Sequence, residues 1–259
     1  HERHFVDCRY VASIDHGVGI DICEQRDLLP HVIAQRTIGA ADQRVGLVWI
    51  RAEDVERDGA DKYMKNLSGL LVAPGFGERG IEGKIKAVEF VRKNKIPFFG
   101  ICLGLQCAVI EFARNMCGME RANSTEFKPT DQNVIDLMLE QKNVKEYGGT
   151  MRLGAFACKL AKSSKASHAY RQEVVTERHR HRFEVNDAFK EKLAAKGMGF
   201  TGICPDNGLT EIIELPDHPW FVGVQFHPEL KSRATNPHPL FREFVRAAME
   251  FQEAKYGKA

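Results

Sequence analysis

Apolar runs and amphipathic stretches alternate along the first half of the chain. Runs rich in β-branched residues at 45–51 and 68–73 are bounded by turn formers, which is typical of buried parallel strands. Between residues 81 and 94, apolar side chains recur at helical spacing. The apolar run 96–101 predicts another strand, and a helix ending at Gly118 follows it. This alternation predicts an α/β fold, with a doubly wound, mostly parallel sheet and helices on both faces.

The second half has a less regular pattern. Residues 119–155 contain polar, glycine-containing stretches that favour functional loops. Two further strands are predicted at 210–215 and 219–226, and an amphipathic helix at 239–256 closes the chain.

Composition narrows the class of protein without identifying it. The 259 residues are 43% hydrophobic and 28% charged with a net charge of +2, as in ordinary globular proteins. We therefore expect no nucleic-acid partner and no membrane partner. The seven cysteines are odd in number and never form a C-x-x-C pair, which favours reduced thiols in the cytoplasm over disulfides or a zinc site.

A G-x-C-x-G motif covers residues 100–104, at the predicted junction of a strand and a helix. The corresponding G-x-S-x-G of serine hydrolases holds the nucleophile on a sharp turn. Cys102 would start the helix, where backbone N–H groups and the helix dipole stabilise a thiolate. The N–H of Leu103 would point to the oxyanion of a tetrahedral intermediate. The alternative is a buried structural cysteine, an interpretation that we keep for Cys107 and Cys117.

His227 and Glu229 follow an apolar run and are separated by one proline. In an extended segment, residues i and i+2 project to the same side, so the two side chains can pair. The carboxylate would then fix the imidazole tautomer and stabilise the imidazolium form. A surface histidine and glutamate at a turn is the alternative, and the cysteine motif favours the catalytic interpretation.

The segment 177–182 is dense in charge and contains His179 and His181. By default such a segment is a solvated face. An anion-binding patch is the other interpretation, and the residues alone leave both open.

Several of these segments together resemble the class I, triad-type glutamine amidotransferases, and within them the glutaminase domains of CTP synthases. The resemblance covers about residues 45–250 and implies the flavodoxin-like core of that family. The segments that carry it are GICLGLQCAVIEFARN (100–115), ANSTEF (122–127), GGTMRLG (148–154), ERHRHRFEVN (177–186) and FVGVQFHPEL (221–230).

The resemblance implies a role for each matching residue. Cys102 would attack the side-chain amide of L-glutamine, with His227 and Glu229 completing a catalytic triad. Pro74 has no N–H, so Gly75 is the preferred oxyanion donor on the side opposite the elbow. The residues implied to bind glutamine or its oxyanion are Gly75, Phe76, Leu103, Gln106, Glu126 and Arg182.

The resemblance also implies the partners of the chain. No cofactor or metal is expected in this domain; ATP and Mg²⁺ would act in an N-terminal amidoligase domain that aminates UTP to CTP. GTP would be an allosteric activator, acting through loops around Arg79 and residues 149–152, and the full enzyme would be a homo-oligomer. The alternatives are an amidotransferase or γ-glutamyl hydrolase for another acceptor, or a catalytically inactive scaffold.

Residues 1–44 do not resemble the family, and its first strand is not recognisable there. We therefore leave 1–44 unassigned, as a segment that arose by a frame error or is foreign, and assign the amidotransferase domain to 45–259. Ala73 also departs from the family, because many relatives have glycine at this position.

Overall fold

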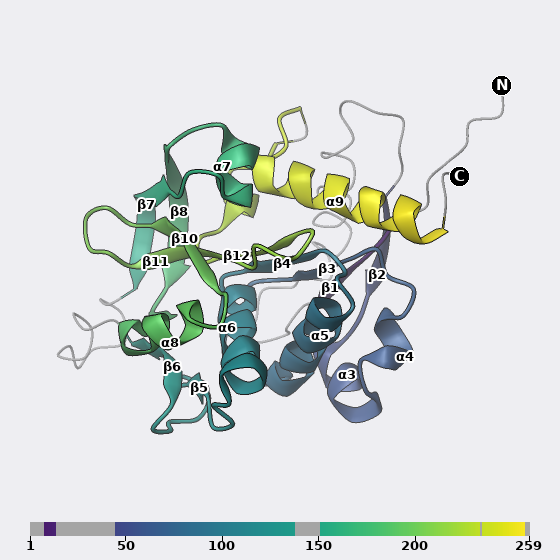
Figure 1. Ribbon diagram of the computed structural model, residues 1–259, viewed down its shortest axis with the longest axis horizontal. Helices are drawn as coiled ribbons and strands as arrows, with labels where there is room; N and C mark the ends of the chain where they lie inside the picture. The colour runs from purple at the N-terminus through teal and green to yellow at the C-terminus, as the bar shows by residue number, and fades with distance from the viewer. Residues whose placement is uncertain (1–7, 14–44, 138–150, 234, 257–259) are drawn as a thin grey trace.

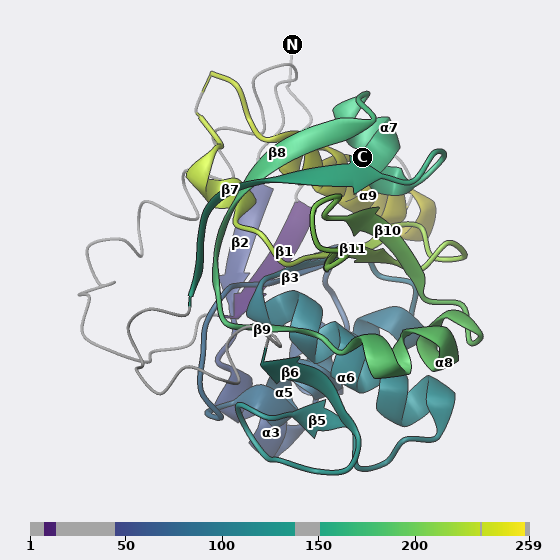
Figure 2. The ribbon, with the colours of Figure 1, turned by 90° about the vertical axis from the view of Figure 1, so that its left-hand side faces the viewer.

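The computed structural model describes residues 8–13, 45–137, 151–233 and 235–256 (Figure 1). A nine-stranded sheet crosses the molecule, and a three-stranded sheet lies beside α6, as Figure 2 shows. The strands are β1 Cys8–Ser13, β2 Val45–Trp49, β3 Gly69–Val72, β4 Phe98–Ile101, β5 Asn123–Ser124, β6 Asn133–Leu137, β7 Arg152–Leu160, β8 Val174–His181, β9 Phe183–Val185, β10 Gly199–Ile203, β11 Thr210–Glu214 and β12 Phe221–Val224. The helices are α3 Ala52–Asp58, α4 Asp61–Met64, α5 Ile81–Lys93, α6 Leu103–Cys117, α7 Lys165–Tyr170, α8 Lys190–Ala194 and α9 Pro239–Tyr256, with 3-10 turns η2 Asp187–Phe189 and η3 Pro228–Leu230.

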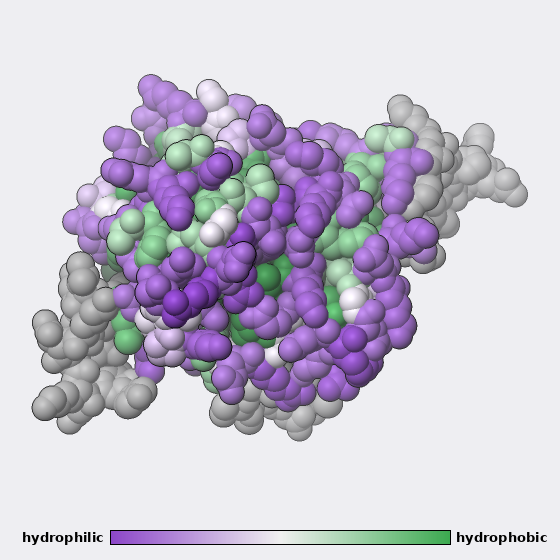
Figure 3. Space-filling model, turned by 60° about the horizontal axis from the view of Figure 1, so that its bottom comes forward, coloured by the Kyte–Doolittle hydropathy of each residue, from purple (hydrophilic) through white to green (hydrophobic). Residues whose placement is uncertain are grey.

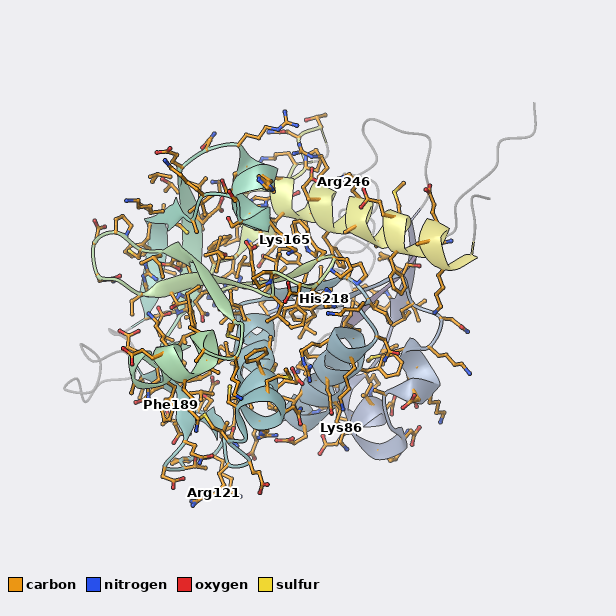
Figure 4. All side chains as sticks on the ribbon, in the orientation of Figure 1. Lys86, Arg121, Lys165, Phe189, His218 and Arg246 are labelled. Carbon is orange, nitrogen blue, oxygen red and sulfur yellow. The ribbon has the colours of Figure 1, made fainter. Side chains whose placement is uncertain are left out.

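Successive residues of the central strands enter separate cores on the two faces of the large sheet. On β4, Phe98 packs against Phe221 on one face, with ring centroids 4.5 Å apart. Its neighbour Phe99 packs against Phe241 of α9 on the other face, at 5.4 Å. Side chains fill the layers above and below the sheet (Figure 4). The continuous apolar sequence of these strands is thereby explained, because both faces are buried.

The large sheet has the strand order β2-β1-β3-β4-β12-β11-β10-β7-β8. The first five strands in this order are mutually parallel, whereas each later neighbour pairs in the antiparallel sense. Helices α5 and α6 cover one face and α9 covers the other (Figure 1). The predicted doubly wound α/β fold is confirmed, and an antiparallel extension is added to it.

Strand β1 comes from the segment in which sequence reasoning recognised no strand. Cys8–Ser13 pairs in parallel with β2 on one side and β3 on the other. The large sheet therefore includes a strand from residues 1–44, while the origin of that segment stays a hypothesis.

The structure corrects two interpretations of the second half. The stretches ANSTEF (122–127) and YGGTMRLG (147–154) within 119–155 were expected to be functional loops, but β5 lies in the first and β7 begins in the second. Residues 147–150 lie outside the described part of the chain. Of the two interpretations left open for 177–182, the fully solvated face is excluded, because most of this segment lies on β8, where buried and exposed residues alternate. His179 and His181 therefore point inward, with only 1% and 5% of their surface exposed.

Gly104 sets the closeness of α6 to the sheet. A Cβ atom at this position would lie 2.4 Å from the carbonyl oxygen of Val72 at the end of β3. A Cβ at Gly100 would likewise meet the backbone of Gly104 at 2.6 Å. The two glycines are therefore required by close backbone packing at the start of α6.

We expect Gly104→Ala to lower the free energy of unfolding by about 1–3 kcal/mol, because the added methyl group overpacks a backbone contact. Urea denaturation measures this change. Gly199→Ala is the matched control, since a Cβ there meets its nearest atoms at 3.3 Å. Equal stabilities for the two variants would show that the contact at Gly104 is unimportant.

Candidate active site

Cys102 lies on a strained turn between β4 and α6. Its backbone has φ 52° and ψ −100°, outside the helical region, and the residue occupies the N-cap position of α6. A positive φ is costly for a residue with a side chain and persists where the surrounding structure enforces it. The turn places the sulfur at the N-terminal end of a buried helix, as predicted for a nucleophile elbow.

The parallel pairing of β4 with β12 brings the two predicted catalytic segments together. Ile101, the last residue of β4, pairs with Val224, the last residue of β12. The backbone N–H of Cys102 continues this contact by donating to the Val224 carbonyl at 2.7 Å. The nucleophile and the segment leading to His227 therefore leave the sheet side by side, at its carboxyl edge.

His227 is held by its neighbours on both sides. Its Nδ1 lies 2.6 Å from Oε1 of Glu229, and its backbone N–H donates to the carbonyl of Arg178 at 2.8 Å. Burial opposes the charged ring, but hydrogen bonding and charge interactions with Cys102 and Glu229 raise the pKa of His227 to about 10. Because Nδ1 is paired with Glu229, Nε2 is the ring nitrogen that can interact with the Cys102 thiol. Nε2 makes no hydrogen bond of ordinary geometry with the described residues. Nε2 is thus available to take the thiol proton.

The other described thiols are in settings that suppress ionisation. The five cysteines whose side chains are described are free and buried. Burial raises the pKa of Cys107 to about 12 and raises that of Cys158 further. Both lie in the apolar cores, and so does Cys117, in agreement with the structural role predicted for Cys107 and Cys117.

The side chains predicted to bind glutamine come from α6, from the turn after β5 and from the residue between β8 and β9. Gln106, one turn into α6, donates through Nε2 to the carbonyl of Phe183 at 3.1 Å. Glu126 accepts the N–H of Gly77 at 2.8 Å. Burial raises the pKa of Glu126, while Gly77 and the positive charge of Arg182 act in the opposite direction. A carboxylate and a guanidinium thus interact close to the segment that Gln106 contacts.

The predicted oxyanion donors lie on two neighbouring strand ends. Leu103 is the first residue of α6, so its N–H has no partner inside the helix. Val72 pairs with Gly100 across β3 and β4, which puts the loop containing Gly75 and Phe76 next to the elbow. Phe76 is 55% exposed.

A buried ionic network, which sequence reasoning missed, lies next to the segment that carries His227. Arg152 on β7 contacts Glu211 at 2.7 Å and Glu184 at 3.4 Å. On β8, His179 Nδ1 lies 2.9 Å from His181 Nε2. Burial, together with the positive charges of Arg152 and His227, lowers the pKa of His179 to about 3. Strand alternation in 177–182 was the available signal, but its partners on β7 and β11 are remote in sequence.

The loops that the resemblance associates with GTP are placed in part. Arg79 forms an ion pair with Glu53, and Arg152 lies in the buried network. Residues 149 and 150 lie outside the described part of the chain.

Comparison with known proteins decides the family. The family model described as Glutamine amidotransferase class-I matches residues 30–247. The chain belongs to this family. The glutaminase domain of Trypanosoma brucei CTPS, solved with bound acivicin, is 32% identical to it, with a TM-score of 0.83 and 94% of each chain covered. Within this family, the chain belongs to the group formed by the glutaminase domains of CTP synthases.

Curated relatives agree with this assignment. The CTP synthase of Carboxydothermus hydrogenoformans is 55% identical over 210 residues, which are 81% of this chain and 39% of that protein. The CTP synthase of Chlorobium phaeobacteroides is 58% identical over 213 residues, with 81% and 38% covered. The chain therefore spans well under half the length of these relatives.

A more distant structure shares the fold alone. A GMP synthase protein from Thermoplasma acidophilum aligns with a TM-score of 0.60 at 14% identity, covering 96% of this chain and 97% of that one.

No helix among the described residues is long and apolar enough to cross a membrane. The face of the molecule seen in Figure 3 is mainly hydrophilic.

We predict that replacing Glu211 by glutamine changes the pH dependence of stability. Burial raises the pKa of Glu211 from 4.5 to about 7, against the opposing effect of Arg152. Between about pH 4.5 and pH 7, the folded chain therefore keeps a proton on Glu211 that the unfolded chain releases. The wild type loses stability relative to Glu211→Gln as the pH rises through this range. Urea unfolding at a series of pH values measures the difference. The exposed Glu173→Gln is the control, and a pH-independent difference for Glu211→Gln would contradict the prediction.

Proposed function

We propose that this chain hydrolyses L-glutamine to glutamate and ammonia, with Cys102 as the nucleophile. The observation that carries the proposal is the meeting of the Cys102 elbow with His227, whose other ring nitrogen is held by Glu229 at 2.6 Å. A thiol, an imidazole and an orienting carboxylate form the constellation needed for acyl transfer.

The proposed reaction proceeds by acylation and hydrolysis. Nε2 of His227 takes the thiol proton, and the sulfur of Cys102 attacks the amide carbon of glutamine. The tetrahedral oxyanion is stabilised by backbone N–H groups of Leu103 and Gly75. His227 then gives its proton to the departing nitrogen, which leaves as ammonia, and a γ-glutamyl thioester remains. Water, deprotonated by His227, attacks the thioester and releases glutamate and the thiol.

The substrate is recognised by its α-amino and α-carboxylate groups. Glu126 would meet the ammonium, and Arg182 would bind the carboxylate in bidentate fashion. Gln106 uses its amide nitrogen to donate to Phe183 and to Gln225, so its carbonyl oxygen is the acceptor it offers to the ammonium. Acivicin is bound in the Trypanosoma brucei glutaminase domain, and we expect it to compete with glutamine here.

In the full-length protein, the ammonia would aminate UTP to CTP at an amidoligase domain, with consumption of ATP in the presence of Mg²⁺. This proposal is supported by the 55% sequence identity to the CTP synthase of Carboxydothermus hydrogenoformans, of which the matched residues make up 39%. GTP activation, homo-oligomer formation and a cytoplasmic location belong to the same proposal. An amidotransferase or hydrolase for another acceptor, or an inactive scaffold, remains as the alternative for experiment to exclude.

Cys102→Ala is expected to lower glutaminase activity by at least about a thousandfold, because the covalent route is lost. Glutamate release measures the effect. Cys117→Ala is the matched control, since it removes a thiol from the far end of the same helix. Near-normal activity of Cys102→Ala in a folded protein would reject the mechanism.

Joining the chain to the amidoligase half of a CTP synthase relative tests the wider proposal. We expect CTP formation from UTP and ATP to become glutamine-dependent, and Cys102→Ala in the joined protein to retain only activity with free ammonia. Glutamine hydrolysis without any glutamine-dependent CTP would indicate a different acceptor.

A further inference from the structure

Gln225 is the residue that the sheet places beside the nucleophile. Because Ile101 pairs with Val224 across the parallel strands, the next positions bring Gln225 alongside Cys102. The Gln225 side chain is fully buried, and its amide nitrogen donates to the Cys102 sulfur at 3.5 Å. No role was assigned to it from the sequence.

The orientation of the Gln225 side chain is fixed by its neighbours. Its carbonyl oxygen accepts a hydrogen bond from Nε2 of Gln106 at 3.4 Å, and Gln106 also donates to the Phe183 carbonyl at 3.1 Å. The backbone N–H of Gln225 donates to the Glu211 carbonyl on β11 at 2.9 Å. With its oxygen engaged by Gln106, the amide of Gln225 presents a nitrogen to the sulfur.

An N–H donor aimed at sulfur favours the thiolate over the thiol. Hydrogen bonds to charged acceptors are stronger than those to neutral ones, particularly in a buried site. His227, steadied by Glu229, supplies the positive charge next to the sulfur. Gln225 adds a neutral donor, anchored by its neighbours, that can fix the direction of the sulfur.

We propose that Gln225 is a positioning residue for this reaction: it orients and stabilises the Cys102 thiolate, and it links the sulfur to the glutamine-binding side chain of Gln106. The inference rests on the proposed glutaminase function. A ligand that contacts Gln106 would thereby restrain the Gln225 amide, so occupancy of the substrate site and alignment of the nucleophile become coupled.

The pH dependence of Cys102 alkylation by iodoacetamide tests this role without any need for turnover. Gln225→Met removes the amide donor and keeps a side chain of similar length. We expect the midpoint of its alkylation profile to shift to a pH about one unit higher than in the wild type. Gln225→Glu places a carboxylate beside the sulfur, so its profile should move further in the same direction. Glutamine turnover should show a fall of at least about tenfold in kcat and a smaller change in KM.

Gln252→Glu is the matched control, because it makes the same change of charge on α9, where Gln252 accepts a hydrogen bond from Ser68. Its alkylation profile and turnover should equal those of the wild type. Unshifted profiles in both folded Gln225 variants would overturn the proposal. A shifted profile in a protein whose wild type does not hydrolyse glutamine would instead reject the proposed function and leave the role of Gln225 standing.

A measurement on the wild type covers the case in which the variants do not fold. The side-chain amide resonances of Gln225, followed by NMR, should titrate together with the Cys102 thiol and shift on its alkylation. Amide resonances that respond to neither event would overturn the proposal.

Discussion

The parallel pairing of β4 with β12 is the constraint on which the site depends. Ile101 and Val224 end these two strands opposite each other, so residues remote in sequence leave the sheet at one edge. The tight start of α6, with Gly104 against Val72, then fixes the sulfur of Cys102 at that edge. The strand register that completes the core therefore also brings Cys102 and His227 together.

Electrostatics within the site follow from burial and pairing together. Water is largely excluded around His227, which alone would favour the neutral ring, yet Cys102 and Glu229 keep it charged. Behind it, burial and the positive charges of Arg152 and His227 lower the pKa of His179 and favour its neutral ring. His179 on β8 and His227, whose backbone N–H donates to the carbonyl of Arg178 on the same strand, thus have opposite protonation tendencies.

Local pattern was sufficient for the parts of the fold whose signal is contiguous. The ends of α6 and α9 and the strands around the elbow follow from apolar periodicity, the nucleophile motif and Gly118. The sequence pattern was insufficient where the environment of a segment depends on residues that are remote in sequence. Charged residues 177–182 resemble a surface until Arg152 is placed beside them, and β1 is recognisable only through its neighbours. The position of Gln225 could likewise not be read from sequence, because it depends on which strand lies next to β4.

NMR titration of the His227 ring probes the contact between the Cys102 thiol and the His227 imidazole. In the wild type the ring should remain protonated up to a pKa of about 10. In Cys102→Ala that pKa should fall, because the thiol contributes to holding the charge. A ring that titrates near the ordinary histidine value of about 6.5 in both proteins would show that the thiol and the imidazole do not interact.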